Sequence, residues 1–163
     1  MPDRTVICNT SPLLYLFQVG QLGLLKSLYG EVRAPLAVQE ELLAGAALGC
    51  LTPDLSELQW LHIEALQDRS LLPAVVDLGP GEAEAIALAL SNPGSLLILD
   101  DSLGRRIANL RRLTYTGTLG VLVKSKQAGF LPKVAPVLEA LRKTTMYLSP
   151  DLIFHVLKEA GEA

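Results

Sequence analysis

Cysteine and histidine are scarce in this sequence, and their scarcity narrows the chemistry that it can carry. Its 163 residues include two cysteines, Cys8 and Cys50, which are too few for a disulfide framework. This cysteine usage favours a reducing, cytoplasmic location. The two histidines, His62 and His155, leave little room for a histidine-rich zinc site or a Ser-His-Asp triad.

Long apolar runs and excess positive charge are also missing. The runs "AIALAL" and "SLLIL" are far shorter than the roughly 20 residues of a membrane span, and the start "MPDRTV" does not resemble a signal peptide. A formal net charge of −3 argues against a protein that coats polyanions, so nucleic acid would need a local basic patch. No GxGxxG or GxxxxGK[ST] follows an expected strand, which counts against a nucleotide-binding domain.

Apolar residues are abundant, at 50 % of the chain against 19 % charged residues, and they suffice for one compact domain over 1–163. Short apolar runs alternate with segments of helical period, which predicts a three-layer α/β/α sandwich with a central, mainly parallel sheet. The expected strands cover 4–9, 30–35, 59–66, 95–101 and 113–116. The expected helices cover 12–28 (two short helices), 34–48, 68–78 (interrupted at Pro73), 79–92, 102–112, 117–128, 132–143 and 149–160.

The stretch "VICNTSPLLYL", residues 6–16, ends its apolar run with consecutive small polar side chains. In open α/β sheets, ligands bind outside the carboxyl ends of the strands, which is where Asn9, Thr10 and Ser11 are expected. Alternatively, Thr10 or Ser11 caps a helix that begins at Pro12. Taken alone, the segment favours the cap.

Carboxylates are expected at the same edge of the sheet. Asp100 and Asp101 follow the most apolar strand, and Glu82 lies in the first turn of the helix before that strand. Glu41 lies on the helix that follows the second strand. Because such carboxylates repel one another, their convergence favours a hard cation with oxygen ligands, Mg²⁺ or Mn²⁺.

Helical geometry narrows the set of acids. Neighbouring residues on a helix point about 100° apart, and residues two positions apart point about 200° apart. Glu84 therefore cannot face the same ion as Glu82, and Glu40 diverges from Glu41. We prefer Glu82 and Glu41. Each acid also has a structural explanation. The helix dipole favours Glu82 near a helix N-terminus, and Asp101 can cap a helix. Glu40, Glu41 and Glu84 can be solvated surface residues.

Five pieces of the sequence, in this order, resemble the PIN-domain family, and more closely its prokaryotic PIN-like branch of predicted nucleic-acid-binding proteins. They are "VICNTSPLLYL", "AVQEELLAG", "LGPGEAEAIALAL", "LLILDDSLGRRIA" and "YTGTLGVLVKSKQAG", which together extend over nearly the whole chain. The resemblance implies a compact α/β nuclease whose acidic residues hold Mg²⁺ or Mn²⁺ for RNA cleavage. It also implies a homodimer and a toxin that is neutralised by a small antitoxin.

The resemblance carries roles onto particular positions. A typical PIN nuclease has aspartate where this chain has Asn9, and an amide oxygen can bind Mg²⁺ but adds no charge. A second interpretation is therefore a catalytically weakened module that binds nucleic acid or a partner protein. The resemblance places the family's catalytic positions on Asn9, Glu41, Glu82 and Asp101. It places the metal ligands on Glu41, Glu82, Asp100 and Asp101, with Glu84 as an alternative acid. It places the groups that orient metal-bound water on Asn9, Thr10 and Ser11.

Basic residues follow the acidic tip of the apolar strand. On a helix, Arg105 and Arg112 share a face, whereas Arg106 points elsewhere. Lys124 on the next helix extends this surface. We expect Arg105, Arg106, Arg112 and Lys124 to contact phosphate groups, and the alternative is that they are solvated surface residues.

Overall fold

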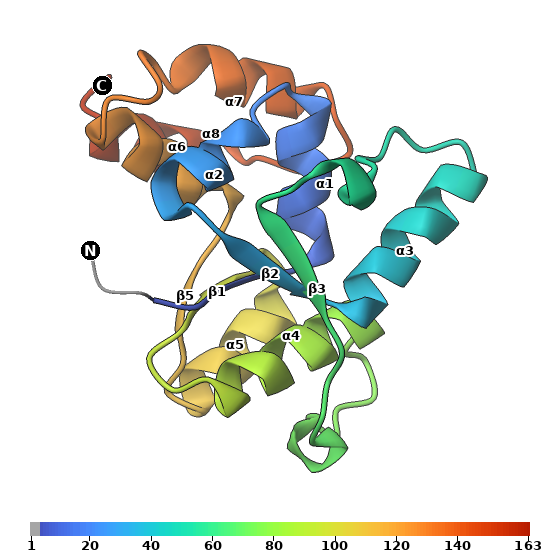
Figure 1. Ribbon diagram of the computed structural model, residues 1–163. Helices are drawn as coiled ribbons and strands as arrows, with labels where there is room; N and C mark the ends of the chain where they lie inside the picture. Colours follow the sequence, from blue (N-terminus) through green and yellow to red (C-terminus); the bar gives the residue numbers. More distant parts are fainter. Residues whose placement is uncertain (1–3) are drawn as a thin grey trace.

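A five-stranded sheet forms the centre of the computed structural model, which describes residues 4–163 (Figure 1). All strand pairs are parallel, in the order β3-β2-β1-β4-β5, as expected for strands that alternate with helices. β3, in the segment 59–66 that was expected to form a strand, lies at one edge of the sheet. The strands are β1 (Val6–Cys8), β2 (Val32–Pro35), β3 (Leu61–Glu64), β4 (Leu96–Ile98) and β5 (Thr114–Thr116).

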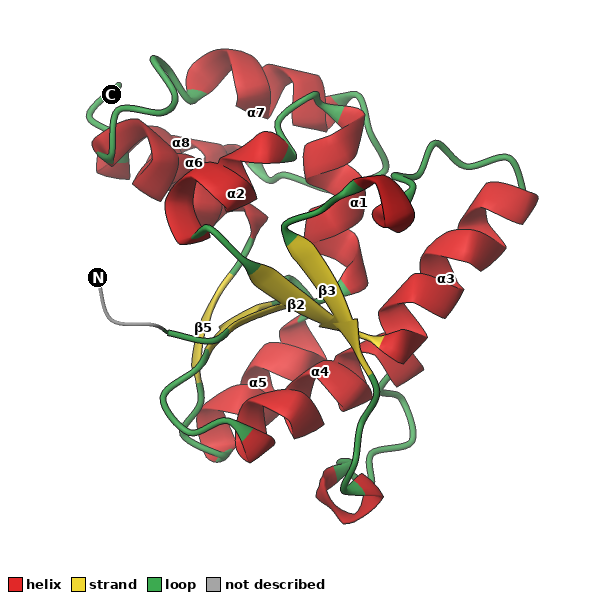
Figure 2. Ribbon diagram, viewed as in Figure 1, coloured by secondary structure: helices red, strands yellow, loops and turns green. Residues whose placement is uncertain are grey.

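Helices cover both faces of this sheet, which confirms the predicted three-layer α/β/α architecture (Figure 2). Figure 1 shows α4 and α5 below the sheet and α1, α2, α6, α7 and α8 above it. No helix in the described part of the chain is both long and apolar enough to cross a bilayer. The helices are α1 (Thr10–Gln18), α2 (Gly23–Tyr29), α3 (Leu36–Ala47), α4 (Pro80–Ser91), α5 (Ser102–Leu110), α6 (Thr118–Gln127), α7 (Ala135–Arg142) and α8 (Pro150–Glu159).

Alternation along β1 divides the core into two parts. Val6 and Cys8 face the larger apolar cluster, which α1, α2, α6, α7 and α8 complete. Ile7 faces the smaller cluster, formed with α4 and α5. Because both faces are covered, the central strands β1 and β4 are apolar throughout, and this is why their sequences read as continuous hydrophobic runs.

Two local predictions are wrong. Segment 68–78 is not a helix, because it contains only a 3-10 turn at Arg69–Leu71, where the Asp68 side chain accepts hydrogen bonds from Ser70 and so competes with helical bonding. The first helix begins at Thr10 instead of Pro12, with Asn9 and neither Thr10 nor Ser11 at the cap position. The start of the chain, on which the signal-peptide prediction depends, lies in part outside the described residues.

The carboxyl edge of the sheet gathers segments that are distant in sequence. Cys8 pairs with Ile98 in the parallel register of β1 and β4, and the backbone N–H of Asn9 donates a 3.0 Å hydrogen bond to the Ile98 carbonyl. Helix α3 leaves this edge and packs against α1 and α4. The expected convergence of the first strand's tip with the acidic segments therefore occurs here.

Candidate nuclease site at the carboxyl edge of the sheet

Asn9 lies at the centre of this edge and is fully buried. It occupies the cap position of α1, yet its side chain makes no capping hydrogen bond. Within residues 4–163, neither its amide nitrogen nor its amide oxygen has a hydrogen-bond partner of ordinary geometry. A buried amide without partners destabilises the fold by roughly 1–3 kcal/mol, so this side chain is suited to a ligand that would satisfy it.

Glu41 is held beside Asn9 by two protein donors. The Thr10 hydroxyl donates to Oε1 at 2.5 Å, and the Gly81 backbone amide donates to Oε2 at 2.9 Å. Gly81 must lack a side chain here, because a Cβ atom would lie 2.5 Å from Glu41 Oε1 and 3.0 Å from Asn9 Oδ1. The amide and the carboxylate therefore converge on the first turn of α4.

Glu82 approaches the same point from α4. Its burial raises the pKa of the carboxyl group, and the carboxylates of Glu41 and Asp101 raise it further. The Glu82 backbone and, more weakly, the nearby Asn9 side chain act on this pKa in the opposite direction, although the Asn9 contact does not meet the criteria for a hydrogen bond. Glu82 thus lies within the electrostatic reach of both other acids, and this crowding of negative charge favours a cation.

Asp101 approaches the site from the end of β4. It caps α5, with Oδ2 accepting a 2.7 Å hydrogen bond from the Gly104 amide. The structural explanation for this acid is therefore correct, and it does not remove Asp101 from the site, because its carboxylate also acts on Glu82. Ser11 lies next to Thr10 in the first turn of α1.

Two of the alternative acids have structural partners instead. Both oxygens of Asp100 bond to Thr118, one to its amide at 2.8 Å and one to its hydroxyl at 2.6 Å. Glu84 accepts a 3.1 Å hydrogen bond from the Ala37 amide at the start of α3 and lies 3.7 Å from Arg69. Glu84 is therefore not simply a solvated surface residue.

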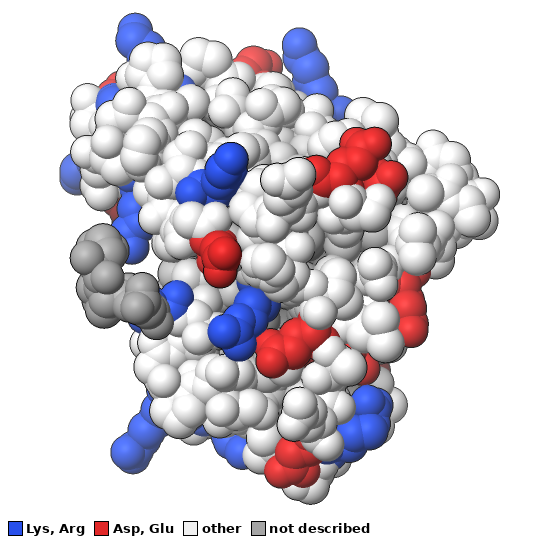
Figure 3. Space-filling model, in the orientation of Figure 1, with Lys and Arg blue, Asp and Glu red and all other residues white. Residues whose placement is uncertain are grey.

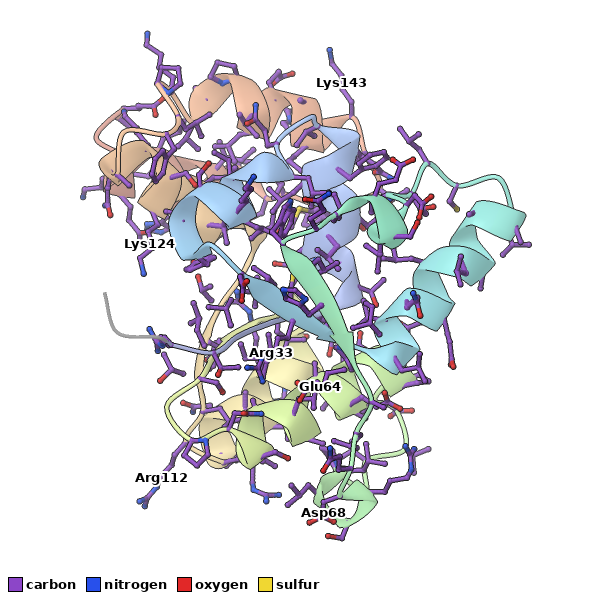
Figure 4. The ribbon with its side chains drawn as sticks, in the orientation of Figure 1. Arg33, Glu64, Asp68, Arg112, Lys124 and Lys143 are labelled. Atoms are coloured by element: carbon purple, nitrogen blue, oxygen red, sulfur yellow. The ribbon has the colours of Figure 1, made fainter. Side chains whose placement is uncertain are left out.

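The basic residues do not gather at this edge. Arg105 and Arg106 lie near the start of α5, close to Asp101, whereas Arg112 follows the end of α5 and Lys124 lies in the last turn of α6. Figure 4 shows Arg112 and Lys124 pointing outward on the side where the sheet begins. In the view of Figure 3, basic and acidic side chains are interspersed and form no continuous basic surface.

The chemical types of the donor atoms suit a hard divalent ion. The donor set consists of oxygen atoms alone, from an unpartnered buried side-chain amide and from carboxylates, of which Glu41 and Asp101 raise the pKa of Glu82, and such a set suits Mg²⁺ or Mn²⁺. Within residues 4–163, however, no three His, Cys, Asp or Glu side chains lie close enough together to hold an ion. Since Asn9 is neutral, the set has a smaller negative charge than four carboxylates would have.

One residue of the site, Gly81, was not foreseen from the sequence. Glycine inside the first turn of a helix costs stability relative to alanine, so its presence between Pro80 and Glu82 was a usable signal. The structure gives the reason, which is the close approach of Glu41 and Asn9.

A parallel α/β sandwich with carboxylate and amide oxygens at the carboxyl edge of its sheet has a nuclease-like architecture. A family model described as a PIN domain matches residues 5–162, so the chain belongs to the PIN-domain family. No curated protein and no solved structure is detectably similar to the chain.

Proposed function

We propose that this protein is a divalent-metal-dependent endoribonuclease. The observation that supports this most directly is the convergence of Asn9, Glu41, Glu82 and Asp101 at one sheet edge, where the buried Asn9 amide has no partner among the described residues. Membership of the PIN-domain family, whose fold is nuclease-like, supports the same activity.

In this proposal Glu41, Glu82 and Asp101 hold Mg²⁺ or Mn²⁺, and the Asn9 amide oxygen completes the set. A bound ion would supply activation of a water molecule for attack on a phosphodiester and stabilisation of the charge that develops on the phosphate. Thr10 positions the Glu41 carboxylate through its 2.5 Å hydrogen bond, and with Ser11 it orients water at the edge. The capping bond from Gly104 fixes the direction of the Asp101 carboxylate.

A cleavage assay on single-stranded RNA with Mn²⁺ tests this proposal. Glu41→Gln and Asp101→Asn should each abolish cleavage. Glu40→Gln is the matched control, since Glu40 is the exposed neighbour of Glu41 on α3 and undergoes the same change of charge. Cleavage that persists in both Glu41→Gln and Asp101→Asn would refute the assignment.

A second candidate function is a module that binds nucleic acid without cleaving it. It is favoured by the neutral Asn9 and by Glu41, whose two oxygens already accept hydrogen bonds from Thr10 and Gly81. This candidate predicts RNA binding that is independent of Mn²⁺ and no turnover in the wild-type protein.

Exposed leucine side chains on and just after α3 form a surface for a protein partner. Leu43, Leu48 and Leu51, on α3 and just after it, have exposed fractions of 65 %, 85 % and 63 %. Leu43 also lines a hollow of about 420 Å³ between α3 and residues 52–56. We assign this surface to a second copy of the chain or to a small antitoxin, which would neutralise this protein as a toxin. A molar mass measured with and without Leu43→Glu distinguishes a homodimer, which the substitution would dissociate, from a monomer.

A further inference from the structure

A second cavity, of about 450 Å³, lies next to the acidic edge and is not used by the proposed chemistry. It opens at the end of β5, between α6, α8 and the segment that joins α7 to α8. Asp100 lines it, and Asp101 is the next residue along the chain, with its Cα atom about 3.8 Å away. A ligand that extends across Asp101 would therefore reach this cavity.

Arg105 forms a fixed wall of the cavity. Its Nε donates a 2.7 Å hydrogen bond to the Leu99 carbonyl, and its guanidinium carbon lies 5.4 Å from the centre of the Tyr115 ring. The guanidinium also lies so close to Gly117 that a side chain at that position would collide with it. Its orientation is therefore set before any ligand binds, and a planar guanidinium offers a stacking surface.

Aromatic side chains form the mouth of the cavity. Tyr147 lines it with 82 % of its surface exposed, so its ring is not used by the core and is accessible to a ligand. His155 also lines it, and the Phe154 ring supports His155 edge-on, with ring centres 6.0 Å apart. Flat rings at an open mouth suit a flat ligand.

The charges in the cavity favour a neutral ring over a phosphate group. Arg105 is the one fully charged cation in its lining, and the lining also contains the carboxylates of Asp100 and Glu159. Asp100 is occupied by Thr118, whereas Glu159 is exposed on α8 and is available to accept a hydrogen bond from an amino group. Nucleobases combine a neutral aromatic face with N–H donors on the edge.

We propose that this cavity binds one unstacked nucleobase of a single-stranded nucleic acid, beside the bond that is cleaved. Tyr147 stacks on the base, Arg105 and His155 form the other walls, and Glu159 accepts from its exocyclic amine. The choice of ligand rests on the proposed ribonuclease function. The binding itself does not require catalysis, because base–aromatic stacking and hydrogen bonding need no metal ion.

The test is fluorescence anisotropy of the full chain with a labelled six-nucleotide single-stranded RNA in EDTA, where no metal-dependent cleavage takes place. Tyr147→Ala should raise Kd by about 5- to 100-fold, the range that loss of one stacked base produces, and Tyr147→Phe should leave Kd unchanged. Phe130→Ala is the control, because Phe130 is an exposed aromatic residue that lines a different cavity, beside Lys124.

A second oligonucleotide with abasic sites separates base binding from backbone binding. We expect it to bind the wild-type protein as weakly as ordinary RNA binds Tyr147→Ala. Equal affinity for abasic and ordinary RNA, or an unchanged Kd in Tyr147→Ala, would overturn the proposal. Competition by a free nucleoside monophosphate at the affinity of the oligonucleotide would support the base pocket and identify a mononucleotide as its ligand. RNA binding that depends on Tyr147, in a protein that does not cleave, would retain this inference and refute the nuclease.

Discussion

The Thr10 hydroxyl donates a 2.5 Å hydrogen bond to Oε1 of Glu41 and joins the start of α1 to α3 across 31 positions of the chain. The other oxygen of Glu41 accepts from Gly81 on α4, so one carboxylate connects three helices at the carboxyl edge of the sheet. In the absence of a cation, these bonds contribute to holding the edge together. A bound ion would share the same carboxylate, and hence the stability of the fold and the function of the site are coupled at Glu41.

Replacement of Thr10 with valine should weaken both the stability of the fold and the function of the site. The variant keeps the shape of the side chain but removes a hydrogen bond to a charged group, which contributes roughly 1.5–3 kcal/mol in proteins. We expect urea denaturation to show a loss of about 1–2 kcal/mol in the free energy of unfolding, because the bond is only partly buried. Thr10→Ser retains the hydroxyl and serves as the control. An unchanged unfolding midpoint in Thr10→Val would mean that the bond contributes nothing.

Gly81→Ala should disturb the site without unfolding the helix. Alanine is the better helix former, but its Cβ would lie 2.5 Å from Glu41 Oε1 and must displace that carboxylate. We expect at least a tenfold loss of Mn²⁺-dependent cleavage, on the order of a 1.4 kcal/mol penalty, with native circular dichroism. Gly23→Ala is the matched control, since Gly23 also begins a helix and a Cβ there meets nothing within 4 Å. Equal activity in the two variants would contradict the crowding argument.

Asp100 and Asp101 should respond differently to the same substitution. Asp100→Asn replaces an acceptor oxygen at Thr118 with a donor, and we expect it to lower the free energy of unfolding by about 2–3 kcal/mol. Asp101→Asn keeps an acceptor for the Gly104 amide, so its effect on stability should be below about 1 kcal/mol, while its effect on cleavage should be complete. Thermal melts and the RNA assay, run on both variants, would reject this division of roles if Asp100→Asn retained full stability.

The order of elements was predictable because it depends on local patterns. The apolar run at 95–99 and the alanine-rich helix after Pro80 show their periods directly, and the parallel sheet follows from their alternation. The choice between adjacent acids depends on contacts over long sequence separations. Asp100 is occupied by Thr118, 18 positions away, and Glu84 by Ala37, 47 positions away. No local pattern contains that information.

The helix predicted over 68–78 did not form because of a local interaction and not a distant one. The periodicity of this segment suggested a helix, but Asp68 bonds locally to Ser70 and Pro73 removes a backbone donor. Short-range side-chain bonding overrode a weak apolar period.

The pH dependence of stability should reveal the crowding around Glu82. Because burial and the neighbouring acids raise the pKa of this carboxyl in the folded state, the folded protein binds more protons than the unfolded chain above the ordinary value of 4.5. In EDTA, the contribution of Glu82 to the free energy of unfolding should therefore fall as the pH rises from 4.5 through the raised pKa. Glu82→Gln removes this dependence, so the variant should be the more stable protein at neutral pH.

The difference between wild type and Glu82→Gln isolates this group from others, such as Asp54, whose pKa is lowered by hydrogen bonds from Ser56. Urea titrations at several pH values give the curve, with Glu40→Gln as the exposed control. A wild-type protein that gains stability over Glu82→Gln with rising pH would contradict the structure.

Asn9→Asp is the sharpest test of the proposed metal site, because it adds a negative charge at the centre of the edge. In EDTA, the new carboxylate is fully buried beside Glu41 and Glu82, and we expect a loss of about 1–3 kcal/mol in the free energy of unfolding. With Mn²⁺, Asn9→Asp should become more stable than the wild-type protein, since an added charged ligand strengthens the binding of a hard cation by about tenfold or more.

Thermal melts across a Mn²⁺ titration measure both effects in one experiment, and the exposed Asn109→Asp on α5 provides the same chemical change away from the edge. If Asn9→Asp is destabilised equally with and without Mn²⁺, the oxygens at this edge do not bind the ion, and the second candidate function, RNA binding without cleavage, becomes the better account of the protein. If Mn²⁺ restores its stability and cleavage increases, Asn9 limits the charge of a working nuclease site.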